Sequence, residues 1–66
     1  MNNMRRARLR ADKSQMELMS ETGIHFSTIS RIEKSWIVPS EQQKKKLAKA
    51  LGLSVKKLFP ALSKRP

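Results

Sequence analysis

The sequence contains no cysteine, one histidine, two glycines and five acidic residues among its 66 residues. The absence of cysteine excludes a disulfide or a thiolate zinc site. Because one histidine and five acidic residues are few potential ligands, we expect neither a metal nor a cofactor. No Ser-His-acid set, glycine-rich phosphate loop or carboxylate pair can be assembled, so we do not expect an enzyme. No apolar run approaches the roughly 20 residues of a membrane span, and no cleavable leader opens the chain. We therefore expect one small, soluble, cytoplasmic domain.

Basic residues dominate what is present. Lysine and arginine number 15, and the formal net charge is +10. A polyanion is therefore the expected partner, either a nucleic acid or an anionic membrane surface. RNA is disfavoured because three aromatic residues offer few platforms for base stacking. A cationic membrane-surface binder stays an alternative, because residues 44–59 alone resemble a basic amphipathic helix, although Gly52 and Ser54 interrupt it.

The spacing of apolar residues predicts an all-α chain of five short helices. The second and fourth helices each begin with a capping pattern, Ser14 with Glu17 and Ser40 with Gln43. Each of these two helices is followed by a glycine, which can adopt the left-handed conformation that closes a helix. The expected segments, caps included, are about 3–11, 14–23, 26–34, 40–52 and 54–59.

Residues 15–34 hold two of these helices, joined by a turn of three or four residues around Gly23. Helices connected so tightly cross at a steep angle, and the second of the pair then protrudes from the domain. On a helical wheel, Ile29 and Ile32 face inward, and the opposite face is small, polar and basic. That outward face carries Ser27, Ser30, Arg31 and Lys34. A protruding helix of this kind fits the major groove of DNA, which is about 12 Å wide.

The sequence resembles the helix-turn-helix domains of phage repressors, Cro proteins and bacterial XRE-type regulators. The matching motifs are Ser14-Gln15-x-Glu17-Leu18, Gly23-Ile24, the segment 27–33, Pro39-Ser40, the segment 47–54 and Leu58-Phe59. The resemblance implies a compact five-helix, lambda-repressor-like domain over residues 1–60, with the helix-turn-helix at about 15–34 and a short basic tail at 61–66.

The resemblance also implies a role for individual residues. Phe26, Ser27 and Arg31 match positions that reach base edges, and Arg31 is the best candidate for selecting sequence, since a bidentate Arg–guanine contact is worth about 1–3 kcal/mol. Phe26 either touches a thymine methyl or seals the start of its helix. His25, near the cap position, is expected to be a turn residue rather than a metal ligand. The expected phosphate contacts are Gln15, Lys34, Ser30 and Lys44, although Lys44 and its neighbours equally fit a solvated face. The expected structural ion pair is Arg8 with Glu33.

Six residues depart from the family pattern, and two of them are Lys44 and Lys45, which stand at positions that are often apolar. Met19 stands where alanine is usual, Thr22 where an aliphatic residue is usual, and Ser35 where glycine commonly ends the third helix. Lys13 replaces the apolar residue that would form a hydrophobic staple before the second helix. We expect these departures to weaken the core rather than to change the fold.

Trp36, Ile37 and Val38 form an apolar loop, which either folds over the fourth helix or marks an interface. Because members of the resembled family often dimerise through this loop and the end of the fifth helix, we expect a homodimer, at least on DNA. The expected interface is Trp36, Ile37, Val38, Phe59 and Leu62. A dimer would bind a palindromic operator with half-sites about 34 Å apart.

The predicted function is sequence-specific binding of double-stranded DNA by a transcriptional regulator, most simply a repressor that occludes a promoter. Such a protein is nucleoid-associated when bound. The alternative is an antitoxin-like module whose main partner is another protein, ranked lower because little sequence extends beyond the predicted domain.

Overall fold

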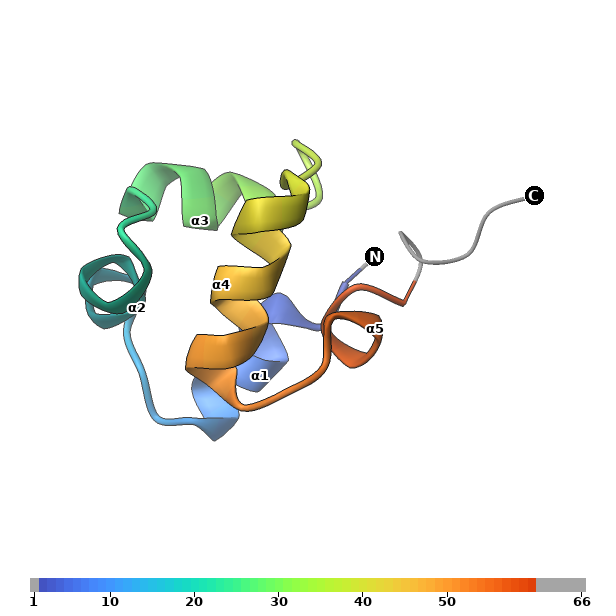
Figure 1. Cartoon of the computed structure of the whole chain (residues 1–66). Coiled ribbons are helices and arrows are strands. Elements are labelled where there is room, and N and C mark those ends of the chain that lie inside the picture. Colours follow the sequence, from blue (N-terminus) through green and yellow to red (C-terminus); the bar gives the residue numbers. More distant parts are fainter. Residues whose placement is uncertain (1, 61–66) are drawn as a thin grey trace.

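The computed structural model describes residues 2–60, which form five helices and no strand. The helices are α1 (Met4–Arg10), α2 (Gln15–Thr22), α3 (Phe26–Glu33), α4 (Glu41–Leu51) and α5 (Val55–Leu58). Figure 1 shows α3 lying across one end of the molecule, with α4 running from that end toward α1 and α5. The expected all-α, five-helix architecture is confirmed, and it is consistent with a lambda-repressor-like fold.

Local side-chain hydrogen bonds set where the helices begin and end. The Ser14 hydroxyl accepts from the Glu17 amide at 3.0 Å, and the Glu17 carboxylate accepts from the Ser14 amide at 2.8 Å. The same reciprocal pair caps α4. The glycines after α2 and α4 adopt left-handed φ values of 78° and 70°. Both predicted capping boxes and both glycine stops are therefore confirmed.

The core draws on all five helices. Ile29 and Ile32 are fully buried, which confirms the inward face predicted for α3. Burying one such side chain stabilises a fold by about 1.5–3 kcal/mol relative to leaving it exposed. Within the described residues, the buried apolar side chains are Met4, Ala7, Leu18, Ile24, Ile29, Ile32, Leu47, Ala48, Leu58 and Phe59.

Phe59 corrects one prediction. It was expected in a dimer interface, but its side chain is fully buried in the core of the single chain. The Asn3 amide donates to the Leu58 carbonyl at 3.0 Å, which fixes the end of α5 against the start of α1 and turns Phe59 inward. Leu62, the other expected interface residue from this end of the chain, lies outside the described residues.

Two of the unusual residues near α2 are accommodated by hydrogen bonds. The buried Thr22 hydroxyl donates to the Leu18 carbonyl at 2.8 Å and accepts from the Ile24 amide at 3.1 Å, so its polarity is satisfied within the core. Lys13 Nζ contacts Glu21 Oε1 at 2.6 Å and the carbonyl oxygen of Ala50 at 3.0 Å. Lys13 thus links α2 to the end of α4, in place of the missing hydrophobic staple.

Ser35 ends α3 in the left-handed conformation that a glycine commonly adopts at this position. It adopts a left-handed φ of 62°, its amide donates to the Ile32 carbonyl at 3.0 Å, and the Trp36 amide donates to the Arg31 carbonyl at 2.9 Å. This pattern is a Schellman motif. Because a residue with a side chain pays about 1–2 kcal/mol to be left-handed, the helix ends correctly but under strain.

Candidate nucleic-acid interface

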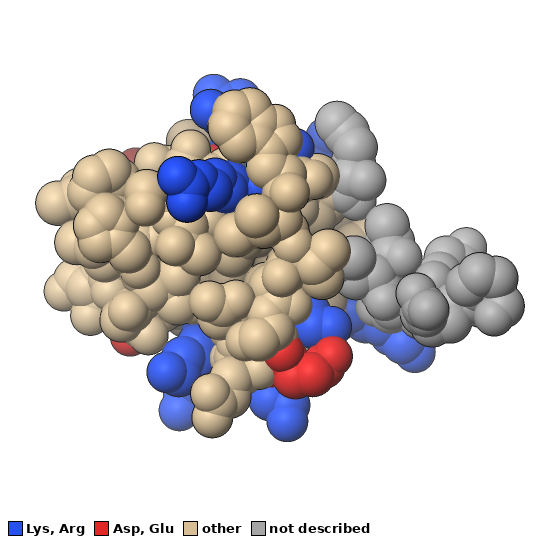
Figure 2. All heavy atoms as spheres, turned by 90° about the horizontal axis from the view of Figure 1, so that it is seen from above, with Lys and Arg blue, Asp and Glu red and all other residues tan. Residues whose placement is uncertain are grey.

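The outer side of α3 is the candidate interface. Arg31 and Lys34 are exposed, Phe26 is 40% exposed, and Ser27 and Ser30 are half-buried. Figure 2 looks down on this end of the molecule: most of the face is tan, blue side chains cross it in one place and otherwise lie at its margins, and red atoms are prominent only at one edge. Because Ile29 and Ile32 anchor the opposite side of the helix in the core, α3 offers its polar and basic side to a ligand.

The start of α3 is held by His25. Its Nδ1 accepts from the Ser27 amide at 3.2 Å and lies 2.8 Å from the Ser27 hydroxyl. The imidazole also stacks on Phe26, with 4.5 Å between ring centroids. His25 therefore caps α3 and orders two of the predicted base-contacting side chains. Within the described part of the chain, no group of three or more His, Cys, Asp or Glu side chains could hold a metal ion.

A buried carboxylate fixes the orientation of α3. Arg8 Nε donates to Glu33 Oε2 at 2.6 Å and Arg8 Nη2 to Glu33 Oε1 at 3.2 Å, a bidentate pair. Arg8 Nη1 also donates to the Lys13 carbonyl at 3.0 Å, and Gln15 Nε2 donates to Glu33 Oε1 at 3.2 Å. The Glu33 side chain is only 5% exposed. One carboxylate thus joins α1, α2 and α3, and the structure brings Arg8, Gln15 and Glu33 together.

The predicted phosphate-binding lysines have different surroundings. Lys34 Nζ lies 4.6 Å from the centroid of the Trp36 ring, a cation–π contact, and it has no acidic partner within residues 2–60. Lys44 Nζ instead pairs with Glu41 Oε2 at 2.8 Å. The hydrogen bond and charge of Lys44 lower the pKa of the Glu41 carboxyl below its ordinary value. Lys44 is therefore less available to a phosphate than Lys34.

Arg31 differs from the paired cations. Across residues 2–60 it has no side-chain hydrogen bond or ion pair, whereas Arg8, Lys13 and Lys44 each have an acidic partner. An exposed guanidinium with no acidic partner keeps its full fork of donors for a ligand.

The loop after α3 stays outside the core. Trp36 is 69% exposed, Val38 is 72% exposed, and Ile37 is also exposed. Of the two alternatives for this loop, folding over α4 is therefore wrong, and the interface alternative stays a prediction. Ser35 and the Schellman motif turn the backbone away from the core before the apolar residues begin, so the loop presents its side chains to solvent beside Lys34.

Asn2 was not singled out from the sequence, yet it positions α3. Its Nδ2 donates to the Ile32 carbonyl at 2.7 Å, and its Oδ1 accepts from the Met4 amide at 3.0 Å. The side chain therefore satisfies one end group of α3 and one of α1. Asparagine just before a helix is a known capping signal, but nothing in the sequence indicates the contact 30 residues away.

Fold and surface together define a helix-turn-helix domain. Compared with known families, residues 4–58 match the one described as "Helix-turn-helix". The chain belongs to this family, in its Cro/C1 or XRE type, which implies DNA binding and is typically non-catalytic. Comparison with curated proteins gives no significant match. None of the helices in residues 2–60 has the length and hydrophobicity needed to span a bilayer.

Proposed function

We propose that this protein is a sequence-specific transcriptional repressor that places α3 in the major groove of its operator and so blocks a promoter. The observation that carries the proposal is Arg31, an exposed guanidinium without an acidic partner among the described residues, on a helix fixed from behind by the Arg8–Glu33 pair. A rigid support matters because base-edge contacts tolerate little displacement. Arg31 selects guanine through its N7 and O6 acceptors.

Phe26 and Ser27 supply the other base contacts in this proposal. The exposed part of the Phe26 ring suits the methyl group of thymine. Because His25 Nδ1 accepts from the Ser27 amide, the Ser27 hydroxyl donates its hydrogen to the same nitrogen, and its oxygen remains able to accept from the amino group of a base. Arg31 therefore contributes most of the discrimination, and Ser27 contributes less.

Phosphate contacts complete the interface. Lys34 has no acidic partner among the described residues, and Gln15 keeps one of its two amide hydrogens after bonding to Glu33. Ser30 lies half-buried on the same face of α3. Lys44 joins only by exchanging Glu41 for a phosphate, so we assign it the smallest share. Such contacts release counterions and make binding weaken steeply with salt.

We further propose that the chain binds a palindromic operator as a homodimer, through the loop of Trp36, Ile37 and Val38. The exposure of Trp36 and Val38 supports this, because a contiguous exposed apolar patch is typical of an interface. Sedimentation on an operator-length duplex should show two chains per duplex, and Trp36→Ser should reduce this to one without unfolding the chain. A single wild-type chain per duplex would refute the dimer.

We propose that the ligand is DNA in the cytoplasm and not a membrane surface. The membrane alternative needed a free apolar face on α4, but Leu47 and Ala48 are buried in the core. Gly52 also ends α4 before α5 begins, so residues 44–59 do not form one amphipathic helix.

The direct test selects bound duplexes from a random pool at near-physiological salt. We expect a palindrome whose half-sites lie about one helical turn apart. Arg31→Ala should relax preference at one position per half-site, at a cost of about 1–3 kcal/mol. The matched control is Arg5→Ala, which removes an exposed arginine from α1. The base-contact assignment fails if Arg31→Ala leaves the preferred sequence unchanged. If the wild-type protein binds DNA but enriches no sequence, the binding is electrostatic and not sequence-specific.

A further inference from the structure

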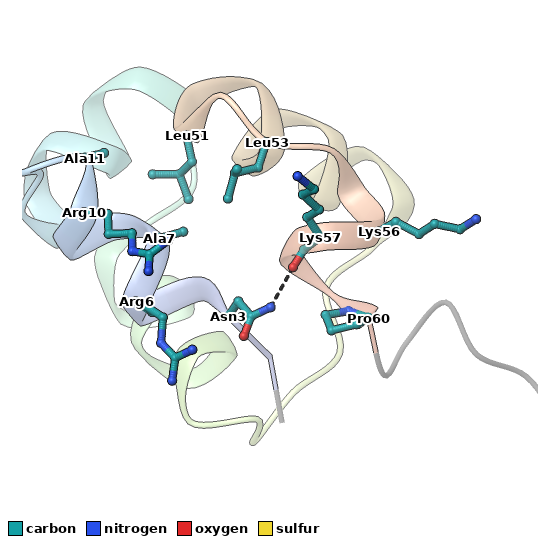
Figure 3. A pocket seen from close by; sticks show the side chains of 10 residues that line it. All are labelled: Asn3, Arg6, Ala7, Arg10, Ala11, Leu51, Leu53, Lys56, Lys57 and Pro60. Carbon is teal, nitrogen blue, oxygen red and sulfur yellow. Dashed lines mark hydrogen bonds between the residues drawn. The ribbon is translucent and has the colours of Figure 1, made fainter.

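A groove lies between α1, the end of α4 and α5, remote from the outer side of α3. Its volume is about 900 Å³, and none of its lining residues comes from α2 or α3. Figure 3 shows its inside: Leu51 and Leu53 project into it from one side, facing Ala7. The Asn3 side chain donates to the Lys57 carbonyl at 2.7 Å and ties the two walls together at one end.

One wall of the groove is a regular helical stripe. Residues 3, 6, 7, 10 and 11 line it, which is the i, i+3, i+4, i+7, i+8 spacing with which one helix packs against another. Two of these positions are alanines, Ala7 and Ala11, whose small side chains permit close approach. Ala7 is buried in the core at 7% exposure, and Ala11 is half-buried. The part of the stripe that stays open to the groove is therefore Ala11 with the exposed Arg6 and Arg10. The stripe is about two turns long and suits a second helix of similar length.

Positive charge borders the apolar floor. Arg6 and Arg10 stand one turn apart on the α1 wall, and Lys57 rises along the α5 wall, whereas the Lys56 side chain extends away. Among residues 2–60, no acidic residue lines the groove. An apolar centre with a charged border is the anatomy of a protein–protein interface. A small-molecule pocket instead buries most of its ligand and places a few polar groups to orient it.

We propose that this groove binds an acidic amphipathic helix of a partner protein, with leucine-like side chains over the half-buried Ala11, Leu51 and Leu53 and carboxylates facing Arg6, Arg10 and Lys57. Charge complementarity selects this occupant. Residues 61–66 of the chain itself contain two cations and no acid, so they do not match. A second copy does not match either, because the two acids of its α2, Glu17 and Glu21, are engaged within their own chain.

The test uses a synthetic peptide of roughly three helical turns, with leucines along one face and glutamates beside them, added to the full chain labelled with ¹⁵N. At near-physiological salt we expect it to bind about tenfold more tightly than a scrambled peptide of equal composition. Only the unscrambled peptide can place leucines on the apolar floor and glutamates beside the basic border at the same time. The amide shifts should move in residues 6–11 and 51–57 and not in α3.

Charge reversal on α1 supplies the matched pair of variants. Arg6→Glu should weaken peptide binding about tenfold, while Arg5→Glu, an exposed neighbour of equal charge that does not line the groove, should not change it. Equal effects of the two substitutions would overturn the proposal, as would equal affinity for the scrambled peptide or shifts confined to α3. The proposal would also be overturned if laurate or non-operator DNA shifted the groove amides and the amphipathic peptide did not.

Discussion

Removing Arg8 should destabilise the protein more than removing any exposed arginine. Arg8→Ala deletes three hydrogen bonds: two to Glu33 and one to the Lys13 carbonyl. It leaves the Glu33 carboxylate with Gln15 as its remaining partner, in a site where the Glu33 side chain is 5% exposed. The cost is therefore that of an uncompensated buried charge rather than that of a surface ion pair.

The size of this cost can be set against the stability of the domain. Breaking a buried pair by removing one partner costs about 3–5 kcal/mol. A domain of this length has a free energy of unfolding of about 3–10 kcal/mol in total. Because 1 kcal/mol shifts Tm by about 4–8 °C at this size, Arg8→Ala should lower Tm by at least about 10 °C. Arg5→Ala, the exposed control on the same helix, should stay within about 0.5 kcal/mol of wild type.

A double substitution separates the cost of an orphaned charge from the worth of the pair. Replacing both partners, Arg8→Met with Glu33→Met, removes the stranded carboxylate and should restore more than half of the lost stability, since apolar replacements of buried pairs are often neutral or better. Urea and thermal denaturation followed by circular dichroism give all the values. The reasoning fails if Arg8→Ala costs less than about 1 kcal/mol, the upper range of a surface pair, or if the double variant is the least stable.

Three further outcomes follow from local geometry and charge. Ser35→Gly should raise the free energy of unfolding by about 0.5–1 kcal/mol, because glycine takes a left-handed φ without strain; no gain in urea denaturation would refute the strain. Lys44→Gln should return the lowered pKa of Glu41 toward its ordinary value in an NMR titration. The stability contributed by this pair is present above the unfolded-state pKa of Glu41 and is lost as pH falls through the lower folded-state pKa. Added salt should weaken DNA binding but raise Tm, because it screens the self-repulsion of a +10 chain; a Tm that falls with salt would contradict this.

The helices and their ends could be predicted because their signals are local. Ser14 and Ser40 lie three residues from the partners with which they form capping boxes. The inward side of α3 also follows from spacing within eight residues. The same argument places Ser30 and Arg31 on the outer side, whereas Phe26 was assigned only through the family resemblance. The bases that these side chains contact could not be predicted from the sequence, because they depend on the DNA that is bound.

The errors arose where distant residues decide the outcome. Phe59 follows a helix of four residues, and its burial depends on the Asn3–Leu58 contact across the whole chain. The positions of Lys13 and Asn2 likewise depend on carbonyls at the ends of helices that are far away in sequence. The pattern of residues in a helix indicates which of its sides is apolar, but it does not predict which other helix end that helix contacts in the fold.

The distribution of acidic partners separates stability from recognition. Glu17 caps α2, and Glu21, Glu33 and Glu41 each pair with a cation of the fold. In the described chain, Arg31 keeps no such partner. Because so few acids are present and most are engaged internally, the net charge of +10 falls on cations that do not hold the fold. Substituting those cations should therefore change binding with little effect on folding, whereas substituting Arg8 should act on folding first and on DNA binding only through it.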